Sequence, residues 1–302
     1  MPGAASDPAW MKEAGHILGL TLTQRTYREA CGPCPKCGGK DRFLVFEDGG
    51  SWCRQCHYIK WWAGTPPTPQ QLEESHAARA ERQANLMARM ASVHDWEAYH
   101  AALSNGSGEH IGDWLEHGLV EDEIATWGLG YCKSCPLCCE SPSLTIPVFK
   151  HQMLVDIRHR LTNATTADRY RSHIAGLTPS IFNSDALRTS ETILIVEGEK
   201  KAILSVRAGF KASLGLPGAQ YGLSLLDTLT TSDEKQMIVL ALDPYQTANA
   251  ERLAFQIGSR ARVADFPAKP DDYFLRYGAK AYAEVIRQAR PVRASRPAGY
   301  RR

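Results

Sequence analysis

The chain has no apolar run that approaches the roughly 20 residues of a membrane-spanning helix. Its N-terminal part lacks the basic start and the continuous apolar stretch of a secretion signal. The phosphate-cradling loop Gly-x-x-x-x-Gly-Lys-Ser/Thr is missing as well. These absences predict a cytoplasmic protein that has no membrane partner and no P-loop motor of its own.

A strong excess of charge is also missing, since 35 Lys and Arg face 33 Asp and Glu for a formal net charge of +2. Any affinity for nucleic acid would therefore come from local patches. With 302 residues, of which 43% are hydrophobic and 23% charged, the chain is long enough for two or three globular domains. Nine cysteines in two tight clusters indicate metal ligands rather than disulfides.

Acidic residues follow short apolar runs in the second half of the chain. Residues 192–196 lead into Glu197, residues 237–242 into Asp243, and a third run is followed by Asp271. Apolar runs that alternate with helical patterns are typical of buried parallel strands, whose carboxyl ends gather ligand sites. The sequence thus predicts a Mg²⁺ site at one sheet edge. The plainer alternative is that these acids cap helices.

The same stretch resembles the Toprim domain of primases, topoisomerases and some nucleases. The residues that carry the resemblance are Ile195-Val-Glu-Gly-Glu-Lys200, Leu242-Asp-Pro244 and Pro270-Asp-Asp-Tyr273. The resemblance implies that Glu197 is a general acid or base or part of the metal site. It also implies that Asp243 and Asp271 bind Mg²⁺, or Mn²⁺ in its place.

Two positions depart from the Toprim pattern. Tyr245 stands where the second aspartate of an Asp-x-Asp motif is usual, and Lys201 stands where primases commonly have an acid. Cations are unfavourable at a helix N-terminus, so Lys200 and Lys201 are expected to face something anionic, such as phosphate.

Two Cys-x-x-Cys pairs lie near the N-terminus. Cys34 and Cys37 are separated by 15 residues from Cys53 and Cys56. Such knuckles, brought together by a hairpin, form a zinc ribbon in which four thiolates surround Zn²⁺. Cys31 and His57 lie close enough to compete as ligands.

The segment Cys34-Pro-Lys-Cys-Gly-Gly-Lys-Asp-Arg-Phe43, followed by the second pair, resembles the zinc-binding domain of bacterial and phage primases. In front of a Toprim domain it implies a DnaG-type primase of the stand-alone form found in phages, plasmids and mobile elements. Cations interleaved with aromatic residues suit a single strand of nucleic acid. Those that we select are Arg42, Arg54 and Trp61, whereas Phe43 and Trp52 could equally pack the ribbon core.

A second cysteine cluster consists of Cys132, Cys135, Cys138 and Cys139. It could hold a second zinc ion or part of an iron–sulfur site, but one short loop cannot easily surround a zinc ion alone. Reduced cysteines without a ligand are the alternative, and the primase resemblance does not require this cluster.

Two apolar segments, 144–149 and 153–158, are expected to pair as strands. They lead to Arg160, Arg169 and Arg171, which would form a basic face for template or nucleotide phosphates. A similar arginine pattern in primases supports this choice, and an ordinary solvated strand face is the alternative.

The expected fold is α+β and multidomain. We predict a zinc-ribbon template-recognition domain (1–64), a linker helix (65–92), the N-terminal part of a primase core (93–189), an α/β Toprim catalytic domain with a parallel sheet flanked by helices (190–290) and a disordered basic tail (291–302).

The expected function is that of a DNA primase, which makes RNA primers on single-stranded DNA from ribonucleoside triphosphates. Zn²⁺ and Mg²⁺ or Mn²⁺ would be its cofactors, and a separate replicative helicase its partner. A catalytically degenerate factor that binds single-stranded DNA is the first alternative, favoured by Tyr245 and Lys201. A Toprim nuclease is the second.

Overall fold

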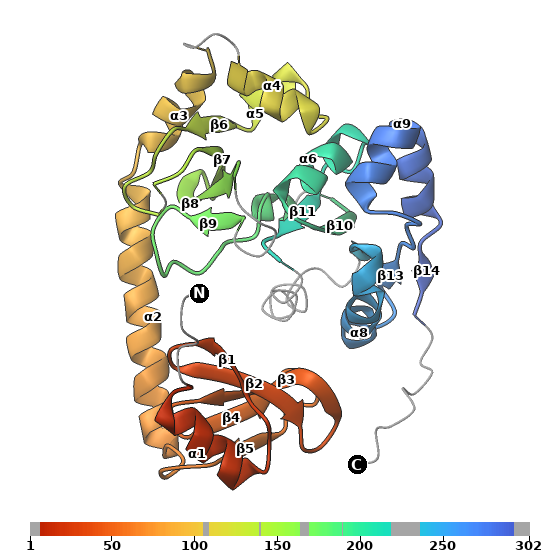
Figure 1. Cartoon of the computed structure of the whole chain (residues 1–302). Helices are drawn as coiled ribbons and strands as arrows, with labels where there is room; N and C mark the ends of the chain where they lie inside the picture. Colours follow the sequence, from red (N-terminus) through yellow and green to blue (C-terminus); the bar gives the residue numbers. More distant parts are fainter. Residues whose placement is uncertain are drawn as a thin grey trace, which may run out of the picture. The chain divides into compact units, whose positions relative to one another are not determined.

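A computed structural model describes residues 7–104, 109–138, 140–163, 169–188, 190–218 and 236–292. The chain divides into two compact units, Met1–Ala80 and Glu81–Arg302 (Figure 1). The boundary falls inside the long helix α2 (Pro69–Ala91), which the sequence analysis assigned to the linker. The expected mixed α+β architecture, with a ribbon followed by a larger core, is confirmed.

The N-terminal unit contains a five-stranded antiparallel sheet in chain order, together with α1 (Ala9–Leu18) and the start of α2. The strands are β1 (Thr23–Thr26), β2 (Glu29–Cys34), β3 (Gly38–Phe46), β4 (Gly50–Cys53) and β5 (Ile59–Trp61). The small core under α1 includes Phe43, Val45 and Trp62, all buried. Phe43 thus packs the ribbon, as the plainer alternative proposed, whereas Trp52 is 36% exposed.

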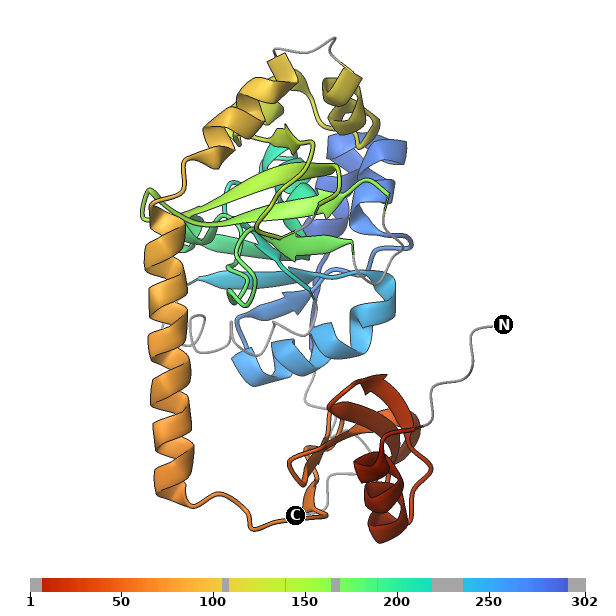
Figure 2. The same cartoon turned by 60° about the vertical axis from the view of Figure 1, so that its left-hand side comes forward.

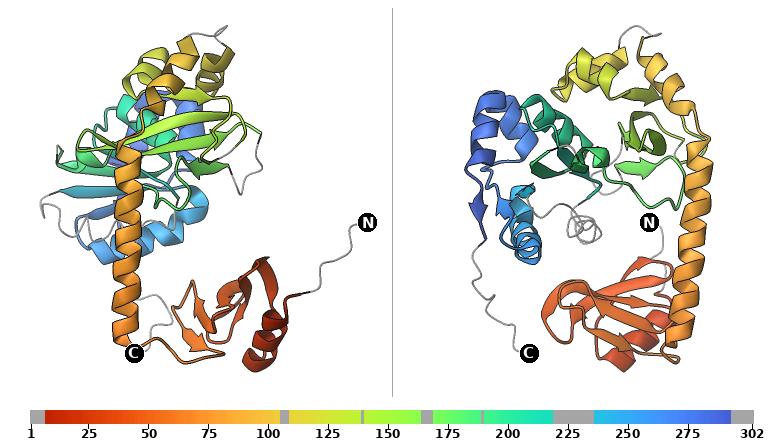
Figure 3. Two further views of the ribbon diagram at one scale, coloured as in Figure 1. Left: turned by 90° about the vertical axis from the view of Figure 1, so that its left-hand side faces the viewer. Right: turned by 180° about the vertical axis from the view of Figure 1, so that it is seen from behind.

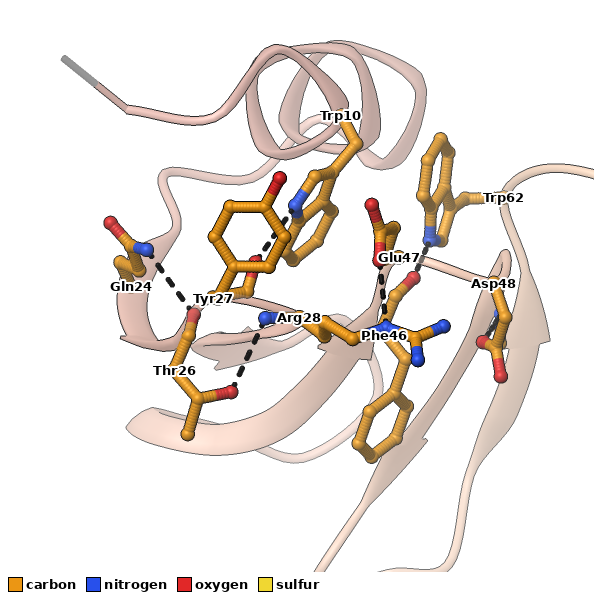
Figure 4. Close-up of polar contacts among 10 residues, drawn as sticks. Trp10, Gln24, Thr26, Tyr27, Arg28, Phe46, Glu47, Asp48 and Trp62 are labelled. Carbon is orange, nitrogen blue, oxygen red and sulfur yellow. Dashed lines mark hydrogen bonds and ion pairs between the residues drawn. The ribbon is translucent and has the colours of Figure 1, made fainter.

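Aromatic residues fasten α1 to this sheet. The indole N–H of Trp10 donates to the carbonyl oxygen of Tyr27 over 3.2 Å, and that of Trp62 donates to Phe46 over 3.0 Å (Figure 4). The rings of Trp10 and Trp62 stack with centroids 6.4 Å apart. Each of these indole rings contributes a large apolar face, and its N–H group has a hydrogen-bond acceptor. Such contacts help to stabilise a unit that has only a small core.

The C-terminal unit begins with helices and an antiparallel sheet. The helices are α3 (Asp95–Ser104), α4 (Glu109–Glu116) and α5 (Glu121–Thr126), and the strands, in sheet order, are β6 (Gly130–Cys132), β7 (Ser143–Lys150), β8 (Met153–Leu161) and β9 (Tyr170–Ser172) (Figure 2). The two expected strands at 144–149 and 153–158 are β7 and β8, which pair as a hairpin.

A second sheet follows, with the order β11-β10-β12-β13-β14. The helices and strands of this part of the chain are η2 (Ser184–Arg188), β10 (Thr192–Glu197), α6 (Glu199–Arg207), β11 (Ser213–Leu216), β12 (Met237–Ala241), η4 (Pro244–Gln246), α8 (Thr247–Ile257), β13 (Ala261–Val263), α9 (Pro270–Arg287) and β14 (Arg290–Pro291). Strands β11, β10, β12 and β13 are parallel, and β14 is antiparallel. Alternate residues of β10 and β12 pack against α6 and α9 on one face and against α8 on the other (Figure 3).

The segment between Glu109 and Thr126 forms two helices, α4 and α5. Gly118 separates them with φ of 80°, and a Cβ at this position would come within 2.0 Å of the Leu275 side chain. The carbonyl oxygen of Gly118 accepts a hydrogen bond from Arg207 over 2.6 Å, which joins the break to α6. Only a residue without a side chain fits this turn, so the packing of α9 decides where the helix ends.

Two of our predictions concern segments that the structure describes only in part or not at all. Of the predicted tail, only Pro291 and Val292 are described, and Pro291 belongs to β14. Cys139 lies outside the described residues. In the part of the chain that the structure describes, none of the helices combines the length and the apolar character needed to span a bilayer.

Candidate functional site

Three carboxylates lie at one edge of the parallel sheet. Glu197 is the last residue of β10, Asp243 lies just beyond β12, and Asp271 is in the first turn of α9. Because β10 and β12 are adjacent and parallel, their carboxyl ends meet. Asp243 and Asp271 are buried. The structure brings acids from three separate segments to one end of the sheet, and the Mg²⁺ site expected there stays a prediction.

Two glycines make the turn after Glu197 possible. Gly198 has φ of 91°, in the region that other residues rarely adopt. A Cβ at Gly215 of β11 would lie 2.8 Å from the carbonyl oxygen of Gly198. The neighbouring strand therefore approaches the turn closely, and α6 starts directly behind the carboxylate.

Two lysines at the start of α6 contact the acids. The ammonium group of Lys200 lies 2.6 Å from Asp271 Oδ2. Lys201 forms an ion pair with Asp243 and lies 3.8 Å from Asp271 Oδ1. The expectation that these lysines face anions is met by the protein's own carboxylates. Two of the acids are thus already paired with lysine side chains of the same chain.

The cluster has opposite effects on two of its acids. Burial, together with the charge of Asp243, raises the pKa of Glu197. Burial would also raise the pKa of Asp271, but the hydrogen bond from Lys200 and the charges of both lysines lower it below its ordinary value. Oε2 of Glu197 and Oδ1 of Asp271 are buried without a hydrogen-bond partner. Buried carboxylate oxygens that accept no hydrogen bond fit a hard cation such as Mg²⁺.

A cavity of about 170 Å³ opens beside these acids. Its charged lining comprises five cationic and three acidic side chains: Arg160, Arg169, Lys200, Lys201, Lys269, Glu197, Glu199 and Asp271. Trp114, His117, Ile146, Tyr170 and Gly198 complete it. The volume is below the roughly 300–1,000 Å³ of typical ligand pockets, so the cavity suits part of a ligand, such as a phosphate group.

The four N-terminal cysteines form a second site. Their sulfur atoms all lie within 4.8 Å of one another, with Cys34 and Cys56 3.7 Å apart and Cys37 and Cys53 3.5 Å apart. Zn–S bonds of about 2.3 Å place tetrahedral thiolates about 3.8 Å apart, so the donor set fits Zn²⁺. Cys31 and His57 are not part of this group.

Backbone donors support these thiols. The amides of Gln55 and Cys56 both lie 3.4 Å from Cys53 Sγ. Burial alone would raise the pKa of Cys53, but these hydrogen bonds contribute to lowering it to about 7. The thiolate form, which binds zinc, is thereby favoured.

Residues 30–65 match the family model described as the zinc-binding domain of primase-helicase. The structure resembles the zinc-binding and RNA polymerase domains of the Aquifex aeolicus primase, with a TM-score of 0.53 and 10% identity, over 93% of this chain and 84% of that chain. It also resembles the RNA polymerase domain of Mycobacterium tuberculosis primase DnaG, solved with a double-stranded DNA oligomer that has a 6-nucleotide overhang. There the TM-score is 0.52 and the identity 15%, over 68% of this chain and 83% of that chain.

The chain has the fold of a DnaG-type primase. The primase fragment of the bacteriophage T7 primase-helicase protein is similar as well, with a TM-score of 0.50 and 13% identity, over 88% of this chain and 100% of that chain. No curated protein matches the sequence. The resemblance that the cysteine and acid motifs suggested is confirmed at the level of the fold.

Within this primase fold, the three arginines selected from the sequence lie on different faces. Arg160 of β8 and Tyr170 of β9 are directly opposite each other and both line the cavity, as does Arg169. Arg171 pairs with His159 instead and does not line the cavity. Successive residues of a strand point to opposite faces, which separates Arg171 from Tyr170, whereas Arg169 lies before the start of β9.

Four lining residues escaped the sequence analysis: Trp114, His117, Tyr170 and Lys269. Tyr170 was recognisable only as the middle of an Arg-Tyr-Arg segment. His117 has its pKa lowered to about 4 by burial and by the charges of Arg160 and Lys200. His117 is therefore neutral near pH 7. Lys269, directly before α9, adds a cation that no sequence motif predicted.

A buried ion pair joins the basic strands of the primase fold to the acid-bearing sheet. Arg158 of β8 is 4% exposed, and its Nε lies 3.6 Å from Glu199, the first residue of α6. Arg158 also lies 3.7 Å from Asp156. The pair places β8 and α6 side by side, so that Arg160 and Lys200 face one cavity.

The nucleic-acid candidates of the ribbon lie near its surface. Arg54 is exposed and donates to the carbonyl oxygen of Asp41 over 2.7 Å, whereas Arg42 and Trp61 are partly exposed. The structure thus leaves cationic and aromatic side chains accessible around the zinc site.

The second cysteine cluster acquires a partner that the sequence did not indicate. Cys135 and Cys138 lie with His159 of β8, and one ligand atom of each is within 4.8 Å of the others. Burial lowers the pKa of His159 to about 3 and also lowers that of His173, so both rings are neutral near pH 7. Cys132 is outside this group.

Proposed function

We propose that the protein is a DNA-dependent primase, which joins ribonucleotides into short RNA primers on a single-stranded DNA template. The observation that carries the proposal is the cavity of about 170 Å³, where five cationic side chains meet Glu197 and Asp271. Transfer of a nucleotidyl group needs cations that hold the triphosphate and acids that hold a metal ion, and the cavity supplies both.

In this proposal the cations position the phosphates. Arg160 and Arg169 approach from the antiparallel sheet, while Lys200 and Lys269 approach from the ends of α6 and α9. Arginine contacts phosphate with two parallel donors and so fixes its orientation, whereas lysine contributes a point charge. Phosphates held from two sides would be aligned for an in-line displacement.

Glu197, Asp243 and Asp271 would hold Mg²⁺ or Mn²⁺, and the oxygens of Glu197 and Asp271 that accept no hydrogen bond support this role. The metal ion, when bound, neutralises charge on the triphosphate and activates the primer 3′-hydroxyl. Glu197 has a raised pKa because it is buried beside Asp243, which suits a group that takes up or releases a proton.

The ribbon would read the template. We propose that a zinc ion on the four clustered cysteines fixes the hairpin and that Arg42, Arg54 and Trp61 contact the single strand by charge and stacking. A separate replicative helicase is the proposed partner, because the family model that matches the ribbon belongs to a primase-helicase.

A specific observation favours a second candidate. Lys201 pairs with Asp243 where a Toprim enzyme would hold metal, so the acids are partly neutralised without one. A catalytically degenerate factor that binds single-stranded DNA would keep the ribbon and the basic cavity but would not need the metal.

The test is incorporation of labelled ribonucleotides on a mixed-sequence single-stranded template with Mg²⁺ or Mn²⁺. The wild type should make short RNA, and Glu197→Gln should lose at least about 100-fold of this activity. The exposed Glu191, at the other end of the same strand, provides the matched control Glu191→Gln, which should retain it.

The same assay separates the alternatives. DNA binding without any RNA product, on every template and with either metal, would favour the binding factor over the primase. Loss of the labelled template strand would indicate a nuclease.

A further inference from the structure

Four side chains lie on the face of the β6–β9 sheet that is opposite to the face of Arg160. Cys135 and Cys138 come from the connection between β6 and β7, and His159 comes from β8. His173, directly after β9, lies beside this group of three: its Nδ1 is 3.6 Å from Cys135 Sγ and 3.0 Å from His159 Nε2, although it is outside the set whose ligand atoms all lie within 4.8 Å of one another. Two thiols and one imidazole thus form the group, and a second imidazole contacts two of its members.

We propose that Cys135, Cys138, His159 and His173 hold a second, structural zinc ion. The spacing of the donors supports this assignment. With Zn–S bonds of about 2.3 Å and Zn–N bonds of about 2.0 Å, tetrahedral geometry puts sulfur about 3.5 Å from nitrogen and two nitrogens about 3.3 Å apart. The observed separations of 3.6 Å and 3.0 Å are close to these edges. Zinc binding would release the two thiol protons.

The outer nitrogen of each imidazole lies near a polar side chain. Nδ1 of His159 is hydrogen-bonded to the hydroxyl of Ser143 at 2.9 Å. Nε2 of His173 lies 3.3 Å from the carboxylate of Asp95, at the start of α3, but forms no hydrogen bond with it. Metal-binding histidines almost always have an outer hydrogen-bond partner, which orients the ring and selects the tautomer that offers its inner nitrogen. His159 therefore has the surroundings of a zinc ligand, and His173 has a carboxylate close to its outer nitrogen.

Cys132 has a different neighbour. It lies on β6 opposite Ser143, and its thiol is hydrogen-bonded to the Tyr99 hydroxyl, an interaction that with burial raises the pKa of that tyrosine. One short loop cannot surround zinc alone, and here two strands supply the missing ligands. In the proposal, two thiols and two imidazoles take the place of the four-thiol set that the sequence suggested.

The position of this site suggests what it does. His159 directly precedes Arg160, and His173 follows the strand that carries Tyr170. A zinc ion would clamp the loop after β6 to the ends of β8 and β9 and to their outer partner on α3. The proposed site is independent of the primase activity, but it would hold rigid the strands that carry the basic side of the cavity.

The experiment measures zinc per chain in the full-length protein by inductively coupled plasma mass spectrometry after dialysis. The wild type should contain two zinc ions, and Cys34→Ser/Cys37→Ser should retain one, in the C-terminal unit. Adding His159→Ala or His173→Ala to that variant should remove the remaining ion. Cys132→Ser is the matched control from the same cluster and should leave the stoichiometry unchanged.

Cobalt substitution gives a readout that does not depend on the folding of the histidine variants. In Cys34→Ser/Cys37→Ser, the thiolate-to-cobalt absorption per bound ion should be roughly half that of a four-thiolate site, because two of four ligands are sulfur. One zinc per wild-type chain, iron in its place, or loss of the ion in Cys132→Ser with retention in His173→Ala would each overturn the proposal.

Discussion

The ribbon and the acid cluster are the two sites where we propose a cation, and they differ in what balances their charge. In the ribbon, four thiols from two short knuckles converge within 4.8 Å. In the acid cluster, Asp243 and Asp271 already contact Lys201 and Lys200. We therefore expect the ribbon to depend on its metal ion for cohesion and the core to keep its shape without one. If the proposal holds, the ribbon has a structural metal site and the core a site where a metal ion is exchangeable.

The largest effect should follow from breaking the ribbon site. Apparent binding free energies of structural zinc are about 10–16 kcal/mol, so Cys53→Ser should unfold the N-terminal unit and leave the C-terminal unit intact. Hydrogen exchange resolved by peptide would show this difference. Cys31→Ser should preserve protection, since Cys31 lies outside the ligand group. A ribbon that stays protected without zinc would refute the comparison.

The next effect concerns catalysis in the core. Asp271→Asn should lower primer synthesis by at least about 100-fold, equivalent to about 2.7 kcal/mol, because it removes a charge from the proposed metal site. The adjacent Asp272 is exposed, so Asp272→Asn is the matched control and should stay close to the wild-type rate. Thermal unfolding would verify that both variants fold. Equal losses in both variants would argue against a special role for Asp271.

Lys201→Ala tests whether the internal cation substitutes for metal. It leaves Asp243 buried without its partner, and breaking such a pair costs about 3–5 kcal/mol. In denaturant titrations the loss should be largest with a chelator present and should shrink when Mg²⁺ or Mn²⁺ is added. Lys200, whose side chain is more exposed, provides the milder control Lys200→Ala. A loss that metal does not change would mean that Lys201 and the metal do not share the site.

The smallest effect should separate two arginines that are near neighbours. Arg160→Ala should weaken binding of ribonucleoside triphosphate by about tenfold, the value of one charge-assisted hydrogen bond. Arg171→Ala should change it by less than about twofold because Arg171 does not line the cavity. Fluorescence anisotropy with a labelled nucleotide would measure both. The reverse order would place the nucleotide on the other face of β9.

Local patterns allowed much of the fold to be predicted. Cys34 and Cys37, like Cys53 and Cys56, belong to knuckles whose geometry is set within a few residues, so their spacing alone indicated zinc. The apolar runs before Glu197 and Asp243 likewise indicated adjacent parallel strands. In both cases the structure depends on residues that are only a few positions apart in the sequence.

Interactions between distant segments were not predictable in this way. His159 and His173 look like ordinary strand residues until the pairing of β8 with β9 brings them together near Cys135. The ion pair of Lys201 with Asp243 joins positions 42 residues apart. Which residues share a face depends on strand register, and a shift by one residue would reverse it.

The sequence by itself determined the ligand types, the order of the two units and the strands that end in acids, because spacing and periodicity act over a few residues. Tertiary structure decided which of these groups meet. It placed Arg160 in the cavity and Arg171 outside it, and it set two lysines against the acids. Those outcomes depend on how sheets and helices pack, which is a property of the whole unit rather than of any one segment.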